Sequence, residues 1–355
     1  MNVRLGVLAT LAVSVSFTLA ACTSASAPTG STGNGATTQA ASASGHGITI
    51  GFANPQDTQP VLQAFQEALS AAAQRGGDKV IALNAALSVN QQVSDIQTLI
   101  TDKVNVIVVF PLAGPALVPV LTKARQAGIK LIGYNALIPG PTAPTSAAPF
   151  DTDLDQGIIV GGAKDAAQYI DQQLNGKGSV VGINIGAPVP SLDAFVANYQ
   201  ADVTQGHSGV KWLATLPDAT DSLAGGQTAM ADGITRFHGN INAVMSYTDE
   251  AAIGAANALR QAGIHNVVLV GQQGNQDGIN AIKAGTIQGD IDTQPWKQAI
   301  YAFNMAKDLV AGKTLPPMVT FPSVFITKDN VSTYVPWQTA ISQISSGKMS
   351  LSVSY

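Results

Sequence analysis

The chain has 355 residues and a formal net charge of −4; 46% of its residues are hydrophobic and only 11% are charged. A chain of this length and composition can bury a large core and favours two lobes over one. The sequence has no cluster of Lys and Arg, which argues against nucleic acid as a partner, and its single cysteine excludes an internal disulfide.

The N-terminus has the pattern of an export signal. Arg4 precedes an apolar run from Leu5 to Ala20, and small residues follow at Ala21 and Cys22. This order predicts a secretory signal over residues 1–21. The tetrapeptide Leu19-Ala20-Ala21-Cys22 resembles the cleavage box of bacterial lipoproteins, which implies that Cys22 becomes the mature N-terminus and carries lipid. The protein would then be exported and anchored to the outer face of the cell membrane. An ordinary signal peptide with an incidental cysteine is the alternative.

Residues 22–47 follow with almost only Ser, Thr, Ala, Gly, Pro, Asn and Gln. Such a composition cannot bury enough apolar surface to fold, so this segment is expected to be a flexible tether.

From residue 48 onwards, strand and helix patterns alternate. The expected strands are 47–53, 79–83, 104–110 and 129–134, and the expected helices are 59–73, 89–101 and 116–127. The run 104–110 is nearly all apolar, as in a strand buried on both faces of a parallel sheet. The alternation predicts an α/β fold with a doubly wound parallel sheet.

Residues 136–150 contain four prolines and are interpreted as a junction between lobes. A second alternating run follows, with helices expected at 157–174, 191–205, 222–237, 249–262, 278–284 and 296–311. Its strands are expected at 179–185, 210–216, 243–246, 266–271, 287–292 and 321–327. Two such halves predict two lobes around a cleft, with ligands held beyond the carboxyl ends of the strands.

Polar side chains gather after these predicted strands, as amides, hydroxyls and a few carboxylates. They are Asn54, Gln56 and Asp57, then Asn135, Thr248, Gln272, Gln273, Thr293 and Gln294, and Asp153 lies before the helix expected at 157. Such groups suit a neutral ligand with many hydroxyls, because each hydroxyl both donates and accepts hydrogen bonds. The alternative is that each residue only caps the helix that follows it.

Patterns for catalysis are absent from the sequence. The four histidines lack metal-ligand spacing, and neither a Gly-x-Ser-x-Gly elbow nor a Walker-type phosphate loop occurs. The carboxylates of Asp218 and Asp221 are interpreted as a solvated turn after Pro217. No metal, no cofactor and no enzymatic activity are therefore expected.

Several segments resemble the type I periplasmic binding proteins that serve sugar importers. They include Gln91-Gln92-Val93-Ser94-Asp95-Ile96-Gln97, the strand 104–111 and, most specifically, the run from Thr248 to Gly263. The resemblance covers about residues 48–330 and implies two doubly wound lobes joined by a three-strand hinge, crossed near 153, 294 and 323. The first lobe would comprise 48–152 plus 295–323, and the second 153–294 plus 324–355.

The resemblance also implies a ligand site, with departures from the family pattern. Asn54, Asp153 and Gln294 keep the family's residues. Asn135, Asp193, Thr248 and Gln273 replace the family's Asp, Arg, Asn and Asp, and Gln56 and Asp57 replace an aromatic pair. A replacement wall for the ligand could come from Tyr134, Tyr247 or Trp296, although ordinary core packing is the alternative for each.

The implied function is capture of a small polar solute, a sugar or polyol, and its delivery to the permease subunits of an ABC importer. A monomer is expected by analogy with the family. Two other readings stay open: a ligand sensor that docks on a membrane receptor, and an exported enzyme acting on a sugar. The enzyme would lack an identifiable nucleophile, base or metal set.

Overall fold

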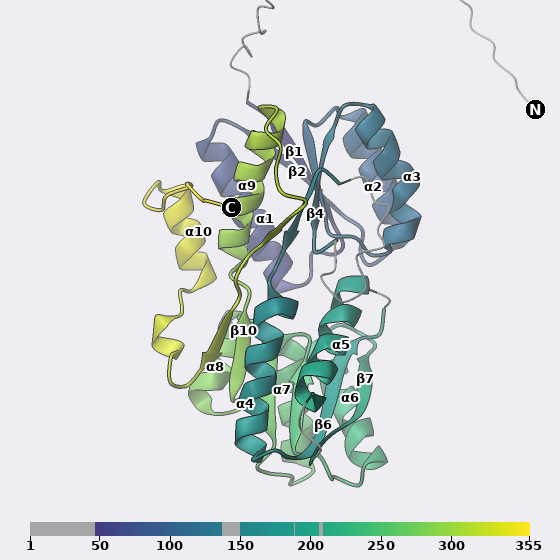
Figure 1. Ribbon diagram of the computed structural model, residues 1–355, viewed down its shortest axis with the longest axis vertical. Helices are drawn as coiled ribbons and strands as arrows, with labels where there is room; N and C mark the ends of the chain where they lie inside the picture. The colour runs from purple at the N-terminus through teal and green to yellow at the C-terminus, as the bar shows by residue number, and fades with distance from the viewer. Residues whose placement is uncertain (1–46, 137–149, 188, 206–208) are drawn as a thin grey trace, which may run out of the picture. The chain divides into compact units, whose positions relative to one another are not determined.

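The computed structural model describes residues 47–136, 150–187, 189–205 and 209–355. The predicted signal, the lipidation of Cys22 and the tether up to residue 46 lie outside the described residues, as does most of the proline-rich junction. The described residues form two α/β lobes, each built on one sheet (Figure 1). In this part of the chain, no helix is both long and apolar enough to cross a bilayer.

The first lobe has a parallel sheet in the order β11-β5-β4-β3-β1-β2. Its strands are β1 (Thr49–Asn54), β2 (Lys79–Asn84), β3 (Val106–Val109), β4 (Lys130–Tyr134), β5 (Thr152–Asp155) and β11 (Met318–Thr320). Its helices are α1 (Pro60–Arg75), α2 (Val89–Thr101), α3 (Gly114–Gln126) and α9 (Pro295–Val310). Helices α1 and α9 pack together, as do α2 and α3 (Figure 1).

Strand β3 shows why this sheet is covered on both faces. Val106 and Val108 are fully buried in the apolar cluster that includes Phe65 of α1. Ile107 and Val109 are fully buried in a separate cluster with Leu121 of α3. Alternate side chains of a strand point to opposite faces, so both faces of β3 are covered, as its apolar sequence predicts.

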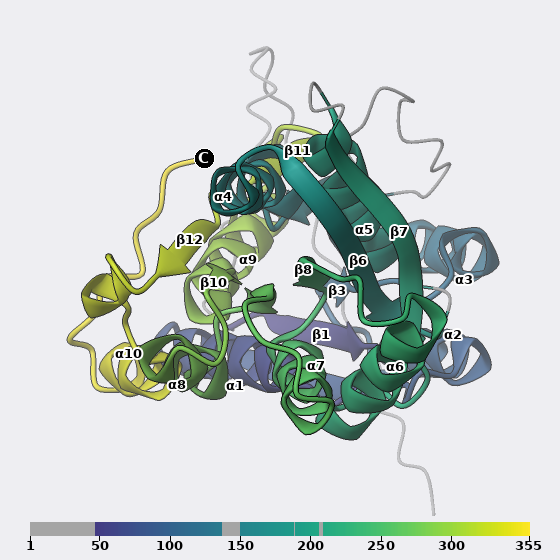
Figure 2. The same cartoon turned by 90° about the horizontal axis from the view of Figure 1, so that it is seen from below.

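The second lobe has a sheet in the order β12-β10-β9-β8-β6-β7, parallel except for the edge strand β12. Its strands are β6 (Lys177–Ile185), β7 (Gly209–Asp218), β8 (Ala243–Ser246), β9 (Val268–Gln273), β10 (Gly289–Asp292) and β12 (Val324–Thr327). Its helices are α4 (Ala163–Leu174), α5 (Pro190–Thr204), α6 (Leu223–Arg236), α7 (Asp249–Gln261) and α8 (Gln276–Ala284). Helices α4 and α5 lie on one side of this sheet, and α6, α7 and α8 lie on the other (Figure 2). This arrangement confirms the predicted α/β fold class.

Helices α6 and α7 approach closely through two glycines. A Cβ on Gly226 would lie 2.4 Å from Cα of Ala251, and one on Gly254 would lie 2.1 Å from the carbonyl oxygen of Leu223. Both contacts are with backbone, which cannot move aside as a flexible side chain can. The glycines inside these helical sequences therefore set the distance between the two helices.

The chain passes between the two sheets at residues 156–157, 293–294 and 321–323. Two of these crossings touch, since Phe321 N donates to the Asp155 carbonyl at 2.7 Å. Gly157 has φ +67°, and a Cβ there would lie 1.9 Å from the Phe321 carbonyl oxygen, so only glycine fits. Because β5 extends to Asp155 in the first sheet, the first lobe ends after residue 155, and the expected boundary at 153 is too early.

The C-terminal helix lies on the first lobe, although the sequence analysis assigned this part of the chain to the second. After β12, residues 328–336, which we call the strap, return to the first lobe, where α10 (Trp337–Ser345) packs on α1. Arg75 Nη1 donates to the carbonyls of Ile344 at 3.1 Å and Met349 at 2.7 Å. The assignment of 324–355 to the second lobe is therefore wrong beyond β12, because the apolar face of α10 is buried against α1 of the first lobe. The expected strand 321–327 is likewise divided into a crossing and β12.

Candidate functional site

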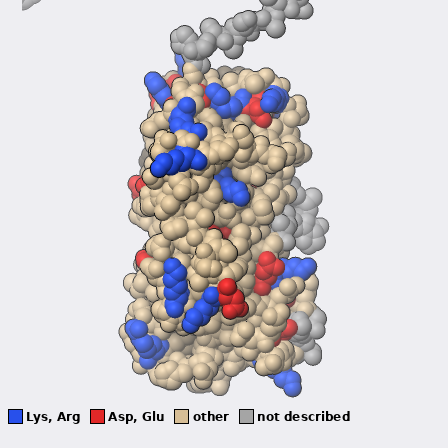
Figure 3. All heavy atoms as spheres, turned by 90° about the vertical axis from the view of Figure 1, so that its left-hand side faces the viewer, with Lys and Arg blue, Asp and Glu red and all other residues tan. Residues whose placement is uncertain are grey.

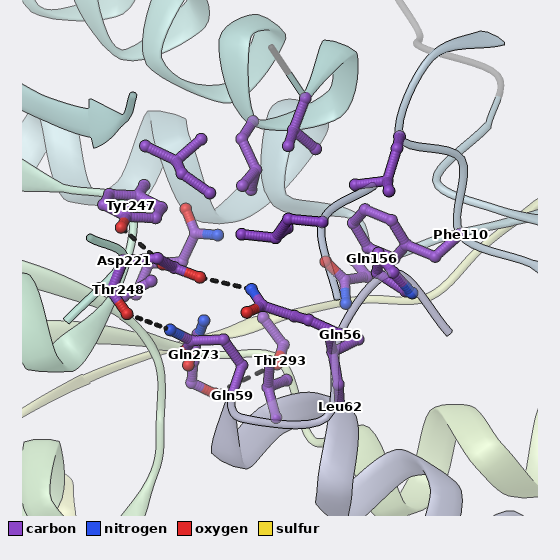
Figure 4. A pocket seen from close by; sticks show the side chains of 18 residues that line it. Gln56, Gln59, Leu62, Phe110, Gln156, Asp221, Tyr247, Thr248, Gln273 and Thr293 are labelled. Atoms are coloured by element: carbon purple, nitrogen blue, oxygen red, sulfur yellow. Dashed lines mark hydrogen bonds between the residues drawn. The ribbon is translucent and has the colours of Figure 1, made fainter. Parts of the chain in front are cut away.

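A cavity lies between the lobes at the carboxyl ends of their strands and holds roughly 560 Å³ of empty space, part of it open to solvent (Figure 4). The first lobe lines it with Pro55, Gln56, Gln59, Val61, Leu62, Leu87, Phe110 and Leu112. The second lobe and the crossings line it with Gln156, Ile185, Val189, Leu192, Asp221, Tyr247, Thr248, Gln272, Gln273 and Thr293. This is the position at which open parallel sheets bind ligands.

A hydrogen bond joins the two lobes across this cavity. Gln56 follows β1, and its backbone N–H donates to Asn54 Oδ1 at 3.2 Å, which fixes the turn. The side-chain Nε2 of Gln56 donates to Asp221 Oδ2 of the second lobe (Figure 4). Gln59 Nε2, just before α1, donates to the Asp221 carbonyl at 3.0 Å. Two amides of the first lobe thus hold one residue of the second.

Asp221 is positioned by the turn between β7 and α6. The buried carboxylate of Asp218 accepts from the backbone N–H groups of Thr220 at 3.0 Å and Ser222 at 3.1 Å, which closes the turn. Tyr247 OH lies 2.6 Å from Asp221 Oδ1 and 3.1 Å from Asp218 Oδ2, and the two carboxylates share its single proton. The earlier interpretation of this segment as a solvated turn is wrong for Asp218, which is fully buried.

The phenol of Tyr247 serves only as a hydrogen-bond donor to these carboxylates. Burial raises its pKa far above the usual range, and the negative charges of Asp221 and Asp218 raise it further. The phenol therefore keeps its proton at physiological pH and cannot act as a base.

Two residues of the lining have a buried amide oxygen without a hydrogen-bond partner among the described residues. These oxygens are Oε1 of Gln59, with 5% of the residue exposed, and Oε1 of Gln273, with 7% exposed. A buried acceptor left without a partner costs about 1–3 kcal/mol, so both oxygens favour a ligand that offers donors. Nine of the 18 lining residues are apolar, among them Leu62, Leu87, Leu112 and Leu192.

The structure brings four of the predicted site residues to the cavity, namely Gln56, Tyr247, Thr248 and Gln273. Thr248 also caps α7, because its Oγ1 accepts from Ala251 N at 3.2 Å. The two readings of this residue, ligand contact and helix cap, are therefore compatible.

Four predicted residues lie behind the lining instead. Asn54 supports Gln56 as described, and Asn135 Oδ1 accepts from Gln156 N at 2.9 Å. Tyr134 is fully buried, stacks on Phe65 at 4.4 Å between ring centroids and accepts from Gln156 Nε2 at 2.8 Å. The fourth, Asp153, accepts from Ala136 N at 2.9 Å.

The other predicted residues lie elsewhere. Asp57 is exposed, and Asp193 is exposed on α5, where it accepts from Asn184 Nδ2 at 2.8 Å. Gln294 is half-buried at the second crossing and begins α9 with φ +48°. Trp296 is 8% exposed and belongs to the apolar core.

Sequence reasoning missed Gln59, Gln156 and Asp221 as polar lining residues, and it counted Gln272 and Thr293 among the strand-end residues without assigning them to the ligand site. Asp221 could have been found if the end of β7 had been predicted correctly. This strand ends at Asp218, two residues later than expected, so residues 219–222 lie at the carboxyl edge of the sheet with the other site residues. Gln156 and Thr293 lie on interlobe crossings, whose positions the resemblance located only approximately.

Two doubly wound lobes that are joined by three crossings and line one cavity are typical of two-lobed α/β binding proteins. Residues 50–314 match the family described as periplasmic binding protein domain. The chain belongs to this family, and its fold is that of the type I periplasmic binding proteins.

Three comparisons illustrate the relationship. A xylitol-binding protein of Mycolicibacterium smegmatis is 26% identical over 283 residues, which cover 78% of this chain and 76% of the relative. A ribose import binding protein of Bacillus subtilis is 24% identical over 275 residues, covering 78% and 86%. An ABC transporter solute-binding protein of Actinobacillus succinogenes, solved with bound D-allose, superposes with a TM-score of 0.72 at 21% identity, covering 81% of this chain and 100% of that one. The last similarity shows the fold.

Proposed function

We propose that this protein is an extracytoplasmic substrate-binding lipoprotein of an ABC importer that captures a sugar or polyol in the interlobe cavity. The observation that carries the proposal is a cavity whose polar groups come from both lobes and meet at Asp221. A ligand that contacts both lobes stabilises their closed arrangement. A permease can then distinguish the closed, ligand-bound protein from the open one. The names of the xylitol-binding and ribose-binding relatives support this ligand class.

The chemistry of the lining supports binding without turnover. The described lining residues include one carboxylate, Asp221, and it is hydrogen-bonded to a phenol that stays protonated. The described residues contain no group of three His, Cys, Asp or Glu side chains placed to hold a metal ion. We therefore assign the protein a binding role and not an enzymatic one.

A thermal-shift screen of the purified mature chain against sugars, polyols and amino sugars tests the ligand class. A ligand at a hundred times its Kd should add about 2.7 kcal/mol to the free energy of unfolding. Gln56→Ala should weaken binding of the best ligand about tenfold, whereas Gln97→Ala, at an exposed position on α2, should not change it. A screen without any stabilising sugar, polyol or amino sugar would contradict the proposal, as would chemical turnover of the ligand.

Anchoring and delivery need separate tests in cells. Cys22→Ser should release the protein from the membrane and abolish labelling with a radioactive fatty acid. Deleting the gene should abolish uptake of the identified ligand, and the wild-type copy should restore it. Uptake that persists without the protein would argue against delivery to a permease.

A further inference from the structure

The described lining of the cavity carries negative charge and no positive charge. Asp221 is the only residue with a full charge among the 18 that line it, and the described lining contains no Lys, Arg or His. Among the residues after 46 that the structure leaves undescribed, which are 137–149, 188 and 206–208, His207 is the only one with a basic side chain, and it precedes the start of β7, whereas Asp221 follows its end. On the face of the molecule shown in Figure 3, Lys and Arg side chains are scattered over the surface.

Further carboxylates lie behind this lining and add to its negative charge. Asp218 is bonded to Tyr247 OH at 3.1 Å, directly behind Asp221. Glu250, at the start of α7, accepts from Asn275 Nδ2 at 2.6 Å, and burial raises its pKa, with the charge of Asp221 contributing. Each of these contacts is with a neutral donor, and the ion pairs of the described residues, such as Lys307 with Asp78, lie elsewhere. The negative charge at this end of the cavity is therefore not neutralised by a neighbouring cation.

The unpartnered polar atoms of the lining point to the same kind of ligand group. Gln59 Nε2 is engaged by the Asp221 carbonyl, so the free atom of this amide is its oxygen, an acceptor. Gln273 Oε1 is also a buried acceptor without a partner among the described residues, and the Nε2 of this amide makes no hydrogen bond there either. An ammonium group has three donors and no acceptor, so it matches a carboxylate and amide oxygens, while a hydroxyl of the same ligand can accept from Gln273 Nε2. A carboxylate group on the ligand would be repelled by Asp221 and is itself only an acceptor.

We propose that the cavity prefers a ligand with a protonated amine over the neutral or acidic ligand of the same skeleton, and that Asp221 is the residue that determines this preference. This inference rests on the proposed function and narrows it to amine-bearing polyols or amino sugars. Asp221 accepts one hydrogen bond on each oxygen in the structure, and a carboxylate has about four acceptor positions, so it can take a ligand N–H in addition. The apolar wall formed by Leu62, Leu112 and their neighbours would face the less polar side of such a ligand.

Matched ligand series test the preference by calorimetry on the mature chain. The hexitol series is sorbitol, 1-amino-1-deoxysorbitol and gluconate, and the pentitol series is xylitol, 1-amino-1-deoxyxylitol and xylonate. In at least one series we expect the amine to bind at least tenfold more tightly than the neutral member, and the acid to bind most weakly. The order of affinities in the wild-type protein is decisive even where a variant fails to fold.

Variants then assign the preference to Asp221. Asp221→Asn should reduce the ratio of amine to neutral affinity to below threefold, whereas Asp193→Asn, on the exposed face of α5, should leave the ratio unchanged. A neutral or acidic member that binds as tightly as the amine would overturn the inference and leave the proposed function standing. If neither these series nor the broader sugar and polyol screen gives any binding, the proposed function itself is overturned.

Discussion

Asp155 shows how one buried carboxyl can shape the pH dependence of stability. It ends β5 at the first crossing and is 1% exposed. Burial raises its pKa to about 6, although hydrogen bonds from Thr320 and the backbone of Gly157 act in the opposite direction. Between about pH 4 and 6 the unfolded chain therefore loses this proton while the folded chain keeps it. The free energy of unfolding falls across this range as pH rises and then levels off.

Asp155→Asn should remove this contribution, because an amide does not titrate. Relative to the wild type, the variant should become more stable by up to roughly 3 kcal/mol as pH rises from 4 to 7. Urea unfolding of both proteins at several pH values measures this difference, in which the other titrating groups cancel. Asp232→Asn, at an exposed position of α6, is the control and should follow the wild-type curve. Parallel curves for Asp155→Asn and wild type would contradict the prediction.

Asp193 and Asp221 are two carboxylates whose positions relative to the cavity could not be predicted from the sequence. Asp193 was expected in the cavity, but α5 turns Val189 and Leu192 toward it and leaves Asp193 exposed. The rotation of a helix about its axis depends on what it packs against, which the order of residues alone does not specify. To place Asp221 at the cavity, the end of β7 must be known to within two residues. Gln56 and Thr248 come just after strongly predicted strands, so the sequence was enough to locate them.

At the scale of elements, the contact between α6 and α7 depends on glycine. Gly226→Ala would place a Cβ 2.4 Å from the backbone of Ala251, so the helices would have to separate. We expect a net loss of about 1–3 kcal/mol in the free energy of unfolding, despite the gain of up to about 1 kcal/mol that Ala brings to a helix interior.

Urea unfolding of Gly226→Ala measures this loss, and Gly114→Ala is its matched control. Gly114 begins α3, and a Cβ there would have no atom within 4 Å, so its substitution should leave stability unchanged or slightly raised. Equal stability of the two variants would show that α6 and α7 can adjust to the added methyl group.

Most elements of the two sheets could be predicted from local patterns. The helix 89–101 and the strand 243–246 have the predicted bounds, because each has a clear apolar period between turn residues. The strand β5 was missed since its sequence, Thr-Asp-Leu-Asp, has two carboxylates that only the tertiary contacts of the crossing allow to be buried. Helix α10 was missed because it is short and is stabilised by α1, which lies more than 260 residues earlier in the chain.

At the scale of the molecule, the strap adds a fourth connection between the lobes. A second hollow lies beside it, lined by Pro60 and Gln63 of α1, by Asn275 and Asp277 at the start of α8, and by Tyr334 and Trp337. The strap therefore spans the gap between α1 and α8 and limits how far the two helices can separate.

Trp337→Ala should release this restraint. Trp337 is 6% exposed and is the first residue of α10, so its loss should free α10 from α1 and cost about 3–5 kcal/mol. Hydrogen exchange should become faster across 328–345, and X-ray scattering should give a larger radius of gyration. Val335→Ala, on the same segment but 39% exposed, should change neither measurement. Unchanged exchange in Trp337→Ala would show that the strap is held by other contacts.

The bond from Gln56 to Asp221 has a consequence for affinity. Any incoming molecule that approaches this carboxylate shares it with an amide that the protein itself supplies. The carboxylate therefore keeps only its remaining acceptor positions for the guest, and a hydrogen bond there contributes about 0.5–1.5 kcal/mol net for a neutral donor and more for a charged one. The same side chain that draws the halves together thus lets this carboxylate favour charged guests over neutral ones.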